Sequence, residues 1–511
     1  MTGFTDLIKS VPDSIQVLLV VVLTAGMGWL TVSRMPRLTA SPEQALILIG
    51  VSVVVGILGG WLHRSRWMML IVPLVFILFL ELGRPEIAGP SVGRLRLDET
   101  YGLLAFGLGR LIPGVISVLS ILLGIRLGRI LDRFLEQGSL FIGTDSSGSF
   151  LSLGILFVLV GGLAVLIALP GSTPEIVDQN GEKIPGSIAS LEEVDLNGSK
   201  QNILIRAQNP DKPVLLYLSG GPGQSDLGFT RVLFEDLTDD FVVVSWDQRG
   251  VGKSYAALDP TSELTLEQAV QDTVELTNYL RERFEEEKIY LLGESYGSLL
   301  GVLTVQERPD LYYAWIGSGQ MVDIADTDLR LYHRLLDYAD QHDLPELKQQ
   351  MLAYGQPPYQ DIPYANGTVM GYYEALYEPY RPPQEYIDRG TNARLGPMNI
   401  LSSEYSLIDR FNVLRGLVDM FTLLYPQLQE VDFRQDVTSL EIPLYILDGA
   451  AEVPARRDLT LEWYQMVQAP EKQIFTFENA AHSVAFEQFQ ELERILNEII
   501  LPATYPVELS N

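Results

Sequence analysis

Cysteine is absent from the 511-residue sequence, and histidine occurs only four times. Without cysteine the chain can form no disulfide bond, and it offers neither a thiolate ligand for a metal ion nor a cysteine nucleophile. No other motif in the sequence predicts a metal ion or an organic cofactor. We therefore expect no metal and no cofactor, and chemistry that depends on ordinary side chains.

Basic residues are outnumbered, because 36 Lys and Arg stand against 65 Asp and Glu, for a net charge of −29 at pH 7. Residues 1–170 hold twelve of the basic and ten of the acidic residues, so the negative excess belongs entirely to residues 171–511. A surface of this sign repels a polyanion. We therefore exclude nucleic acid as a partner and expect a well-solvated surface on the C-terminal part.

Charge is missing altogether from three apolar runs, residues 14–33, 44–62 and 146–169. Backbone amides in lipid must be satisfied within their own segment, so an uncharged apolar run of about 18 or more residues predicts a spanning helix. Residues 1–170 are therefore predicted to form an α-helical transmembrane region in a lipid bilayer.

Two further apolar runs are weaker. Residues 67–80 are few for a span and include Pro73, whereas residues 101–125 are long enough but include Arg110. An arginine in a span must face the helix bundle or reach the interface, and we favour a structural role for it over a polar pathway. We expect five spans, with four as the alternative.

The orientation follows from basic residues near the last run. Arg126, Arg129 and Arg133 precede it, and no basic residue follows until Lys183. Cytoplasmic flanks carry the excess of Lys and Arg. The sequence therefore predicts a multi-pass plasma-membrane protein whose C-terminal domain lies outside the cytoplasm.

After Pro170 the pattern changes to short strands that alternate with amphipathic helices. Asn197-Gly198 predicts a β-hairpin turn. Buried strands are expected at 214–218, 241–245, 289–292, 444–447 and 474–477, and helices at 266–284, 299–306, 459–467 and 485–500. Such alternation predicts one α/β domain over residues 171–511, with a mostly parallel sheet covered on both faces.

The sequence Gly-Glu-Ser-Tyr-Gly at residues 293–297 matches the G-x-S-x-G motif between a strand and a helix. A serine on such a tight turn adopts a strained backbone, and the flanking glycines allow close approach. This context predicts that Ser295 is a nucleophile; the alternative is an ordinary serine helix cap.

A serine nucleophile needs a base and an acid that orients the base. The chain order serine, acid, histidine favours His482 as the base over His333 and His342, which lie in polar helical sequence. Two acids compete for the third role, and we favour Glu452, on a loop, over Asp448, at the end of a strand.

The sequence Gly-Gly-Pro-Gly at residues 220–223 follows the first buried strand. Small residues there allow a backbone N–H to approach a tetrahedral oxyanion, and the residue after the nucleophile supplies a second donor. We expect the oxyanion hole to consist of the amides of Gly221 and Tyr296.

Three motifs, at residues 219–223, 246–254 and 293–298, resemble in order and spacing the prolyl iminopeptidase branch of the α/β hydrolases, which are serine aminopeptidases. The resemblance covers about residues 187–502 and implies the triad Ser295, Glu452 and His482. It also implies that residues 247–249 brace the loops around the site. Two positions depart from the pattern, since many members have His at the position of Ser219 and most have Asp at that of Glu452.

A mostly helical, tyrosine-rich insertion is predicted between residues 321 and 436. In the family that the chain resembles, this insertion is a cap over the site, and acids in the cap hold the free amine of the substrate. Glu374 and Glu378 are the possible equivalents; exposed helix positions explain them equally well.

These features predict a membrane-anchored serine hydrolase that resembles an aminopeptidase and cleaves short peptides or amino-acid amides through an acyl-enzyme. An esterase, lipase or thioesterase with the same triad is the alternative. A non-catalytic sensor joined to a membrane bundle is disfavoured, because a binding domain needs neither a triad nor an oxyanion hole.

Overall fold

The computed structural model describes residues 11–97, 99–137, 147–391 and 400–506, apart from the side chains of residues 136, 137, 147–150, 373, 374 and 391. The chain divides into two compact units, Met1–Pro170 with Ser406–Phe411, and Gly171–Tyr405 with Asn412–Asn511. The first unit is helical, and the second combines a β-sheet with helices.

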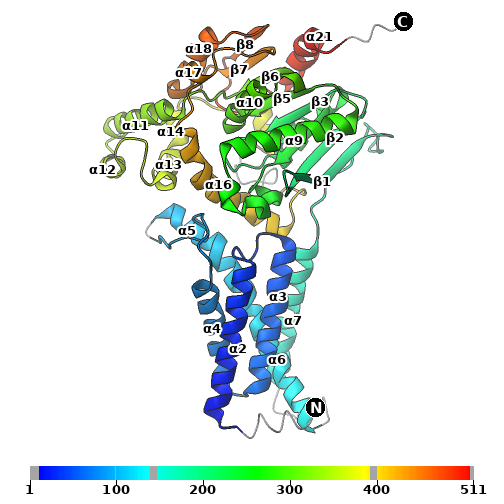
Figure 1. Ribbon diagram of the computed structural model, residues 1–511, viewed down its shortest axis with the longest axis vertical. Helices are drawn as coiled ribbons and strands as arrows, with labels where there is room; N and C mark the ends of the chain where they lie inside the picture. The colour runs from blue at the N-terminus through cyan, green and yellow to red at the C-terminus, as the bar shows by residue number, and fades with distance from the viewer. Residues whose placement is uncertain (1–10, 98, 138–146, 392–399, 507–511) are drawn as a thin grey trace. The chain divides into compact units, whose positions relative to one another are not determined.

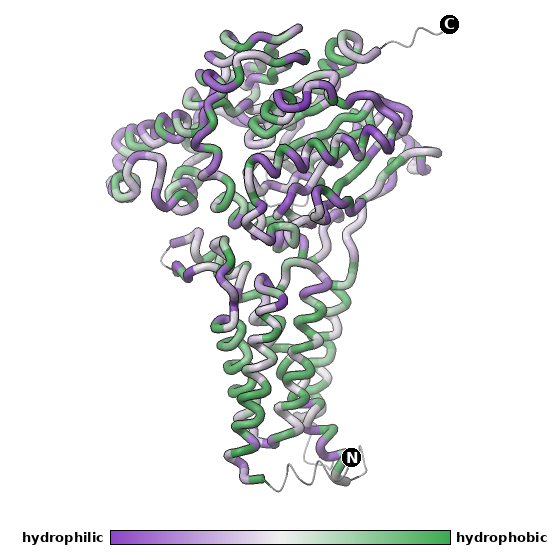
Figure 2. The backbone as a smooth tube through the Cα atoms, viewed as in Figure 1, coloured by the Kyte–Doolittle hydropathy of each residue, from purple (hydrophilic) through white to green (hydrophobic). Residues whose placement is uncertain are grey.

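The first unit consists of long apolar helices with polar residues near their ends (Figure 2). Its elements are α2 (Asp13–Arg34), α3 (Pro42–Leu62), α4 (Met68–Leu82), α5 (Thr100–Phe106), η1 (Gly107–Leu111), α6 (Ile112–Gln137) and α7 (Ser147–Ala168). Within the described residues, four stretches are long and apolar enough to cross a membrane, namely 13–34, 42–62, 100–135 and 151–168. Helix α4 is apolar but has only 15 residues.

Helix α4 nevertheless connects the two ends of the bundle. At one end, Arg129 of α6 donates a hydrogen bond of 2.9 Å to the carbonyl oxygen of Ser65, which precedes α4. At the other end, Arg37, between α2 and α3, donates one of 2.8 Å to the carbonyl oxygen of Ala88, which follows α4. The chain therefore runs the length of the bundle through α4, which is the path that five spans require.

Glycines allow α3 and α6 to pack closely. A Cβ atom on Gly60 would lie 2.2 Å from the carbonyl oxygen of Ile125, and one on Gly124 would lie 2.2 Å from that of Val53. Gly56 and Gly60 on α3, and Gly124 and Gly128 on α6, have the small-x-x-x-small spacing that allows helix backbones to approach in lipid.

Arg110 braces the loop that follows α4. Its guanidinium donates to the Glu81 carboxylate at 3.1 Å and to the carbonyl oxygens of Ser91, Val92 and Gly93 at 3.1, 3.0 and 2.7 Å. These contacts satisfy its donors inside the protein, so they correspond to the structural role favoured from the sequence.

The second unit is built on one eight-stranded sheet in the order β1-β2-β4-β3-β5-β6-β7-β8. Strands β1, β2 and β4 pair antiparallel, and the pairs from β4 through β3 to β8 are parallel. This confirms the predicted α/β-hydrolase fold and adds β6, which the sequence analysis missed. The strands are β1 (Ile188–Leu196), β2 (Ser199–Ala207), β3 (Val214–Leu218), β4 (Val242–Asp247), β5 (Ile289–Glu294), β6 (Tyr312–Ser318), β7 (Leu444–Gly449) and β8 (Lys472–Phe477).

Helices cover both faces of this sheet (Figure 1). On one face Leu215, Tyr217 and Tyr290 pack with Phe234 and Phe486 in a core that α8, α19, α20 and η7 complete. On the other lie α9 and α10. The helices are α8 (Leu227–Leu233), α9 (Leu266–Phe284), α10 (Tyr296–Glu307), α18 (Pro454–Met466), α19 (Val484–Glu487), α20 (Phe489–Ile495), η7 (Leu496–Ile500) and α21 (Leu501–Thr504), with short turns η2 (Asp236–Asp239), η3 (Gly252–Leu258), η4 (Thr261–Glu263) and η5 (Pro309–Leu311).

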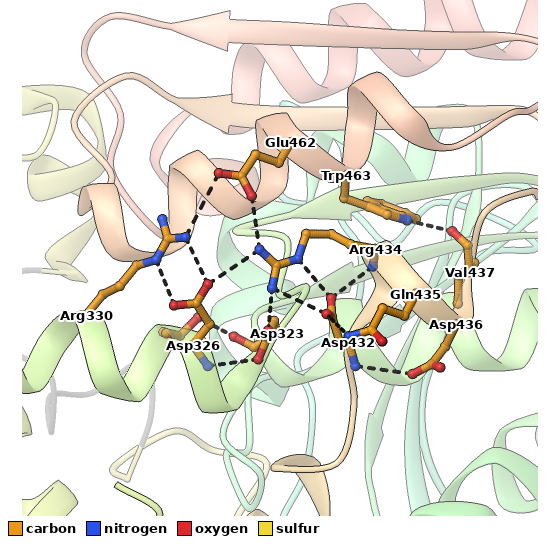
Figure 3. A network of polar contacts seen from close by, with 11 residues as sticks. Asp323, Asp326, Arg330, Asp432, Arg434, Gln435, Asp436, Val437, Glu462 and Trp463 are labelled. Atoms are coloured by element: carbon orange, nitrogen blue, oxygen red, sulfur yellow. Dashed lines mark hydrogen bonds and ion pairs between the residues drawn. The ribbon is translucent and has the colours of Figure 1, made fainter. Parts of the chain in front are cut away.

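The predicted helical insertion lies between β6 and β7. It contains α11 (Ile324–Gln341), α12 (Pro345–Tyr354), α13 (Ile362–Gly371), α14 (Tyr373–Leu376), α15 (Gln384–Tyr386), η6 (Ile387–Thr391), α16 (Leu407–Leu428) and α17 (Phe433–Asp436). Its two ends lie side by side, because the Phe433 amide donates to the Val322 carbonyl oxygen at 3.0 Å. Arg434 adds ion pairs to Asp323 at 2.6 Å and Asp432 at 2.9 Å (Figure 3).

Candidate active site

Ser295 occupies the tight turn between β5 and α10. Its backbone has φ 53° and ψ −120°, a strained conformation for a residue with a side chain. Cβ atoms on Gly293 and Gly297 would lie 2.4 Å from the Gly297 carbonyl oxygen and 2.1 Å from that of Leu218. The Ser295 hydroxyl makes no capping hydrogen bond to α10, so an ordinary helix cap does not explain this serine.

His482 and Glu452 meet beside one another on the loops that follow β8 and β7. The Nδ1 atom of His482 is hydrogen-bonded to Oε2 of Glu452. The other oxygen, Oε1, accepts hydrogen bonds from the Val453 amide at 2.7 Å and the Tyr377 hydroxyl at 2.5 Å. Glu452 is only 8% exposed, so these contacts are shielded from water.

The charge of Glu452 fixes the protonation of the imidazole. Burial by itself raises the pKa of Glu452, but the charges of His482 and Arg456 and the hydrogen bonds from His482 and Tyr377 outweigh burial and lower this pKa to about 2. An ionised carboxylate only accepts hydrogen bonds. The Nδ1 atom of His482 must therefore carry a proton, which leaves Nε2 of the neutral ring free to act as a base.

Asp448, the alternative acid, has a different partner. Its carboxylate accepts hydrogen bonds from Arg457 Nε at 3.0 Å and Nη2 at 2.8 Å, and from the Thr476 hydroxyl at 2.9 Å. Asp448 therefore ties β7 to β8 and α18, while the acid in contact with His482 is Glu452.

The glycine-rich loop after β3 lies against the nucleophile turn. A Cβ atom on Gly220 would lie 3.2 Å from the Cβ atom of Ser295, and Gly221 has φ 113°, which favours glycine. Tyr296 is the first residue of α10, where backbone N–H groups have no acceptor within the helix. The amides of Gly221 and Tyr296 therefore belong to two segments that meet at Ser295.

Short contacts bring the serine and histidine segments together. The Ser295 amide donates to the Ser318 carbonyl oxygen at 3.1 Å, and a Cβ atom on the next residue, Gly319, would lie 3.1 Å from Nδ1 of His482. Within the described residues no hydrogen bond joins the Ser295 hydroxyl to His482. Catalytic hydrogen bonds of this kind are often long before substrate binds.

The residues of the Asp-Gln-Arg motif brace neighbouring loops, as the resemblance implied. Asp247 accepts from the Lys253 amide at 2.8 Å, and Gln248 donates to the Ser219 carbonyl oxygen at 3.4 Å. Arg249 forms a buried ion pair at 2.9 Å with Asp272 of α9, which holds the motif against the helix layer.

The insertion contributes a residue that the sequence analysis did not single out. Tyr377 follows α14, contacts Glu452 and accepts a hydrogen bond of 3.0 Å from Arg456. The neighbouring Glu378 is exposed, and the side chain of Glu374 lies outside the part of the chain that the structure describes. In that part, no group of three or more His, Asp or Glu residues is arranged to hold a metal ion.

The sequence matches the family model described as serine aminopeptidase, S33, over residues 213–360. A curated relative, the probable aminopeptidase YbaC of Bacillus subtilis (strain 168), is 30% identical over 303 residues, which cover 59% of this chain and 93% of the relative. This match includes most of the second unit and nearly all of the relative.

Solved structures with a similar chain fold include the proline iminopeptidase of Mycobacterium smegmatis, with 15% identity, coverage of 61% of this chain and 98% of that one, and a TM-score of 0.42. A proline iminopeptidase-related protein of Thermus thermophilus has 20% identity, coverage of 62% and 99%, and a TM-score of 0.40 to two figures below that of the first, at 0.40. From the family model and the curated relative together, the chain belongs to the serine aminopeptidase family of α/β hydrolases.

Proposed function

We propose that this protein is a membrane-anchored serine hydrolase that releases the N-terminal residue from short peptides or amino-acid amides. The observation that carries the proposal is the buried, ionised Glu452 on Nδ1 of His482, next to a serine on a strained turn. A carboxylate in this position orients the imidazole and stabilises its protonated form. Family membership supports an aminopeptidase over other hydrolases.

In the proposed reaction, Nε2 of His482 takes the proton of the Ser295 hydroxyl while Oγ attacks the scissile carbonyl carbon. The carbonyl oxygen becomes an oxyanion that accepts hydrogen bonds from the Gly221 and Tyr296 amides. When the tetrahedral intermediate collapses, the C–N bond breaks and Nε2–H donates its proton to the leaving amine.

The acyl-enzyme is then hydrolysed by water, which loses a proton to the same nitrogen as it attacks the ester carbonyl. Collapse of the second intermediate returns the proton to Ser295 and releases the carboxylic acid. Glu452 stays ionised throughout, since its lowered pKa of about 2 leaves no proton on it at neutral pH.

A ligand for the substrate's ammonium group is proposed on the insertion. Glu378 is exposed and follows Tyr377, whose hydroxyl contacts the acid of the proposed triad. Glu374, four residues earlier, is the second candidate. A carboxylate near the site would favour substrates with a free amine over N-acylated ones.

Two substrate classes compete, because the same triad hydrolyses esters and the apolar helices favour contact with lipid. We would assay the purified full-length protein side by side on amino-acid arylamides, their N-acetylated forms and acyl esters. The proposal expects the free-amine arylamides to have the highest kcat/KM. Preference for long-chain acyl esters would support the esterase alternative.

The nucleophile is tested with the Ser295→Ala variant and a fluorophosphonate probe. The variant should lose hydrolysis and probe labelling while keeping the circular dichroism spectrum of the parent. Full labelling of the variant would overturn the serine mechanism.

A further inference from the structure

Glu294 joins the nucleophile turn to the histidine loop. It ends β5 directly before Ser295, and its side chain is buried, with 3% exposure. Its Oε1 atom accepts a hydrogen bond of 2.8 Å from the hydroxyl of Ser483, the residue directly after His482. One hydrogen bond therefore connects the neighbour of the proposed nucleophile with the neighbour of the proposed base.

The loop that carries His482 has two more attachments. The Ala481 amide donates to the Glu487 carboxylate at 2.6 Å, and the Ala485 amide donates to the Ser318 hydroxyl at 2.9 Å. These contacts hold the backbone before and after the histidine. The hydrogen bond to Glu294 is the one that fixes Ser483, next to the imidazole, against the turn of Ser295 itself.

A carboxyl group at this position is unfavourable for stability. Burial raises the pKa of Glu294 well above its usual range, the nearby Asp226 raises it further, and the hydrogen bond from Ser483 offsets only part of this. Its Oε2 atom is buried and has no hydrogen-bond partner in the part of the chain that the structure describes. A buried polar atom without a partner destabilises a fold, so stability does not explain this residue.

We propose that Glu294 is a positioning residue: through Ser483 it sets the register of the histidine loop so that Nε2 of His482 faces the hydroxyl of Ser295. The inference rests on the proposed function, in which these two residues are base and nucleophile. A displacement of about 1 Å between such groups lowers turnover by about 100-fold.

The test is a mutant cycle on the full-length protein with the best substrate of the arylamide and ester panel. Glu294→Ala and Ser483→Ala should each lower kcat by about 10- to 100-fold and change KM by less than about threefold. The double variant should be no slower than the slower single variant, because both changes remove the same hydrogen bond. Glu294→Gln should stay within about threefold of the parent, since its amide oxygen accepts the same bond.

A matched control is Asp226→Asn. Asp226 is buried close to Glu294 and is bonded to Tyr217 and Gln224. Removing its charge should leave kcat within about threefold of the parent if the hydrogen bond to Ser483, and not the negative charge of the region, is what matters. A thermal melt of each variant separates loss of fold from loss of turnover.

Parent-like kcat in a folded Ser483→Ala variant, or effects of the two single changes that multiply in the double variant, would overturn the inference. Because Ser483→Ala is a small change, it decides the matter even where Glu294→Ala does not fold. Failure of the proposed function is a separate result, namely Ser295→Ala that keeps its activity and probe labelling.

Discussion

The position of Glu452 separates it from Asp448 by a difference of partner. Glu452 contacts His482, and Asp448 contacts Arg457. If the first carboxylate orients the imidazole, Glu452→Gln should favour the wrong tautomer and lower kcat by about 1,000- to 10,000-fold. Asp448→Asn should lower kcat by less than about tenfold, because it only weakens an ion pair that ties strand to helix.

Steady-state kinetics of both variants measure this difference, with circular dichroism as the check on folding. A crippled Asp448→Asn variant beside a normal Glu452→Gln variant would mean that the wrong carboxylate has been assigned to the triad.

Glu487 makes the stability of the protein depend on pH. Burial raises its pKa from the ordinary 4.5 to about 7; the Ala481 amide lowers it in part, and the charge of Glu452 raises it. Between these two pH values the folded protein holds a proton that the unfolded chain has lost. The stabilisation is therefore complete below about pH 4.5 and disappears as the pH rises through about 7, and the whole change is at most roughly 3 kcal/mol.

Glu487→Gln cannot titrate, so its melting temperature relative to the parent should increase between pH 5 and pH 7.5. Asp226, whose pKa burial raises to about 6, titrates in both proteins and cancels in the difference. Parallel melting curves across this pH range would show that Glu487 is ionised in the fold already at pH 5.

Arg434 closes the insertion at its base (Figure 3). Besides Asp323 and Asp432 it contacts Asp326 of α11 at 3.4 Å and Glu462 of α18 at 3.0 Å. Replacement by Met would leave four carboxylates close together without their shared cation. We expect Arg434→Met to destabilise the protein by about 2 kcal/mol and to lower its melting temperature by roughly 3 °C.

Arg494→Gln is the matched control, because Arg494 pairs with Glu491 and Glu498 on an exposed helix surface. Such surface pairs contribute about 0.5 kcal/mol or less. Equal melting temperatures for the two variants would contradict a structural role for Arg434.

Local patterns predicted most of the sheet but not all of it. The runs that became β3, β4, β5, β7 and β8 are rich in aliphatic residues, and their positions agree with the structure. Strand β6 was missed, because its sequence from Tyr312 to Ser318 mixes aromatic residues with Ala and Gly and lacks an aliphatic run. The Asn197-Gly198 turn was found, since positive φ at both residues has a clear sequence signal.

Long-range contacts in the candidate site could not be predicted in this way. Tyr377 and Glu452 are 75 residues apart, and Glu294 and Ser483 are 189 apart. Hydrophobic periodicity reports which face of an element is buried, but it does not report which loop side chains meet. Only the G-x-S-x-G turn and the chain order of the triad carried enough local information to name candidate residues in advance.

The number of spans decides on which side of the membrane the hydrolase unit lies. Four spans would return the chain to the side on which α2 begins, whereas five spans place the two on opposite sides. The His63 ring, at the end of α3, lies 3.4 Å from the side-chain oxygen of Gln16, so the start of α2 and the turn before α4 share one end of the bundle. Arg126, Arg129 and Arg133 of α6 approach that same end, which the positive-inside rule assigns to the cytoplasm.

The absence of cysteine makes this topology directly measurable, because a single introduced cysteine is the only thiol in the chain. Asp13 at the start of α2 and Glu193 in β1 are both exposed. With five spans and the arginine-rich end inside, Glu193→Cys should react with a membrane-impermeant maleimide in intact cells. Asp13→Cys should react only after the cells are permeabilised. Reaction of both variants, or of neither, in intact cells would mean that α4 does not cross the bilayer, and the reverse pattern would place the hydrolase unit in the cytoplasm.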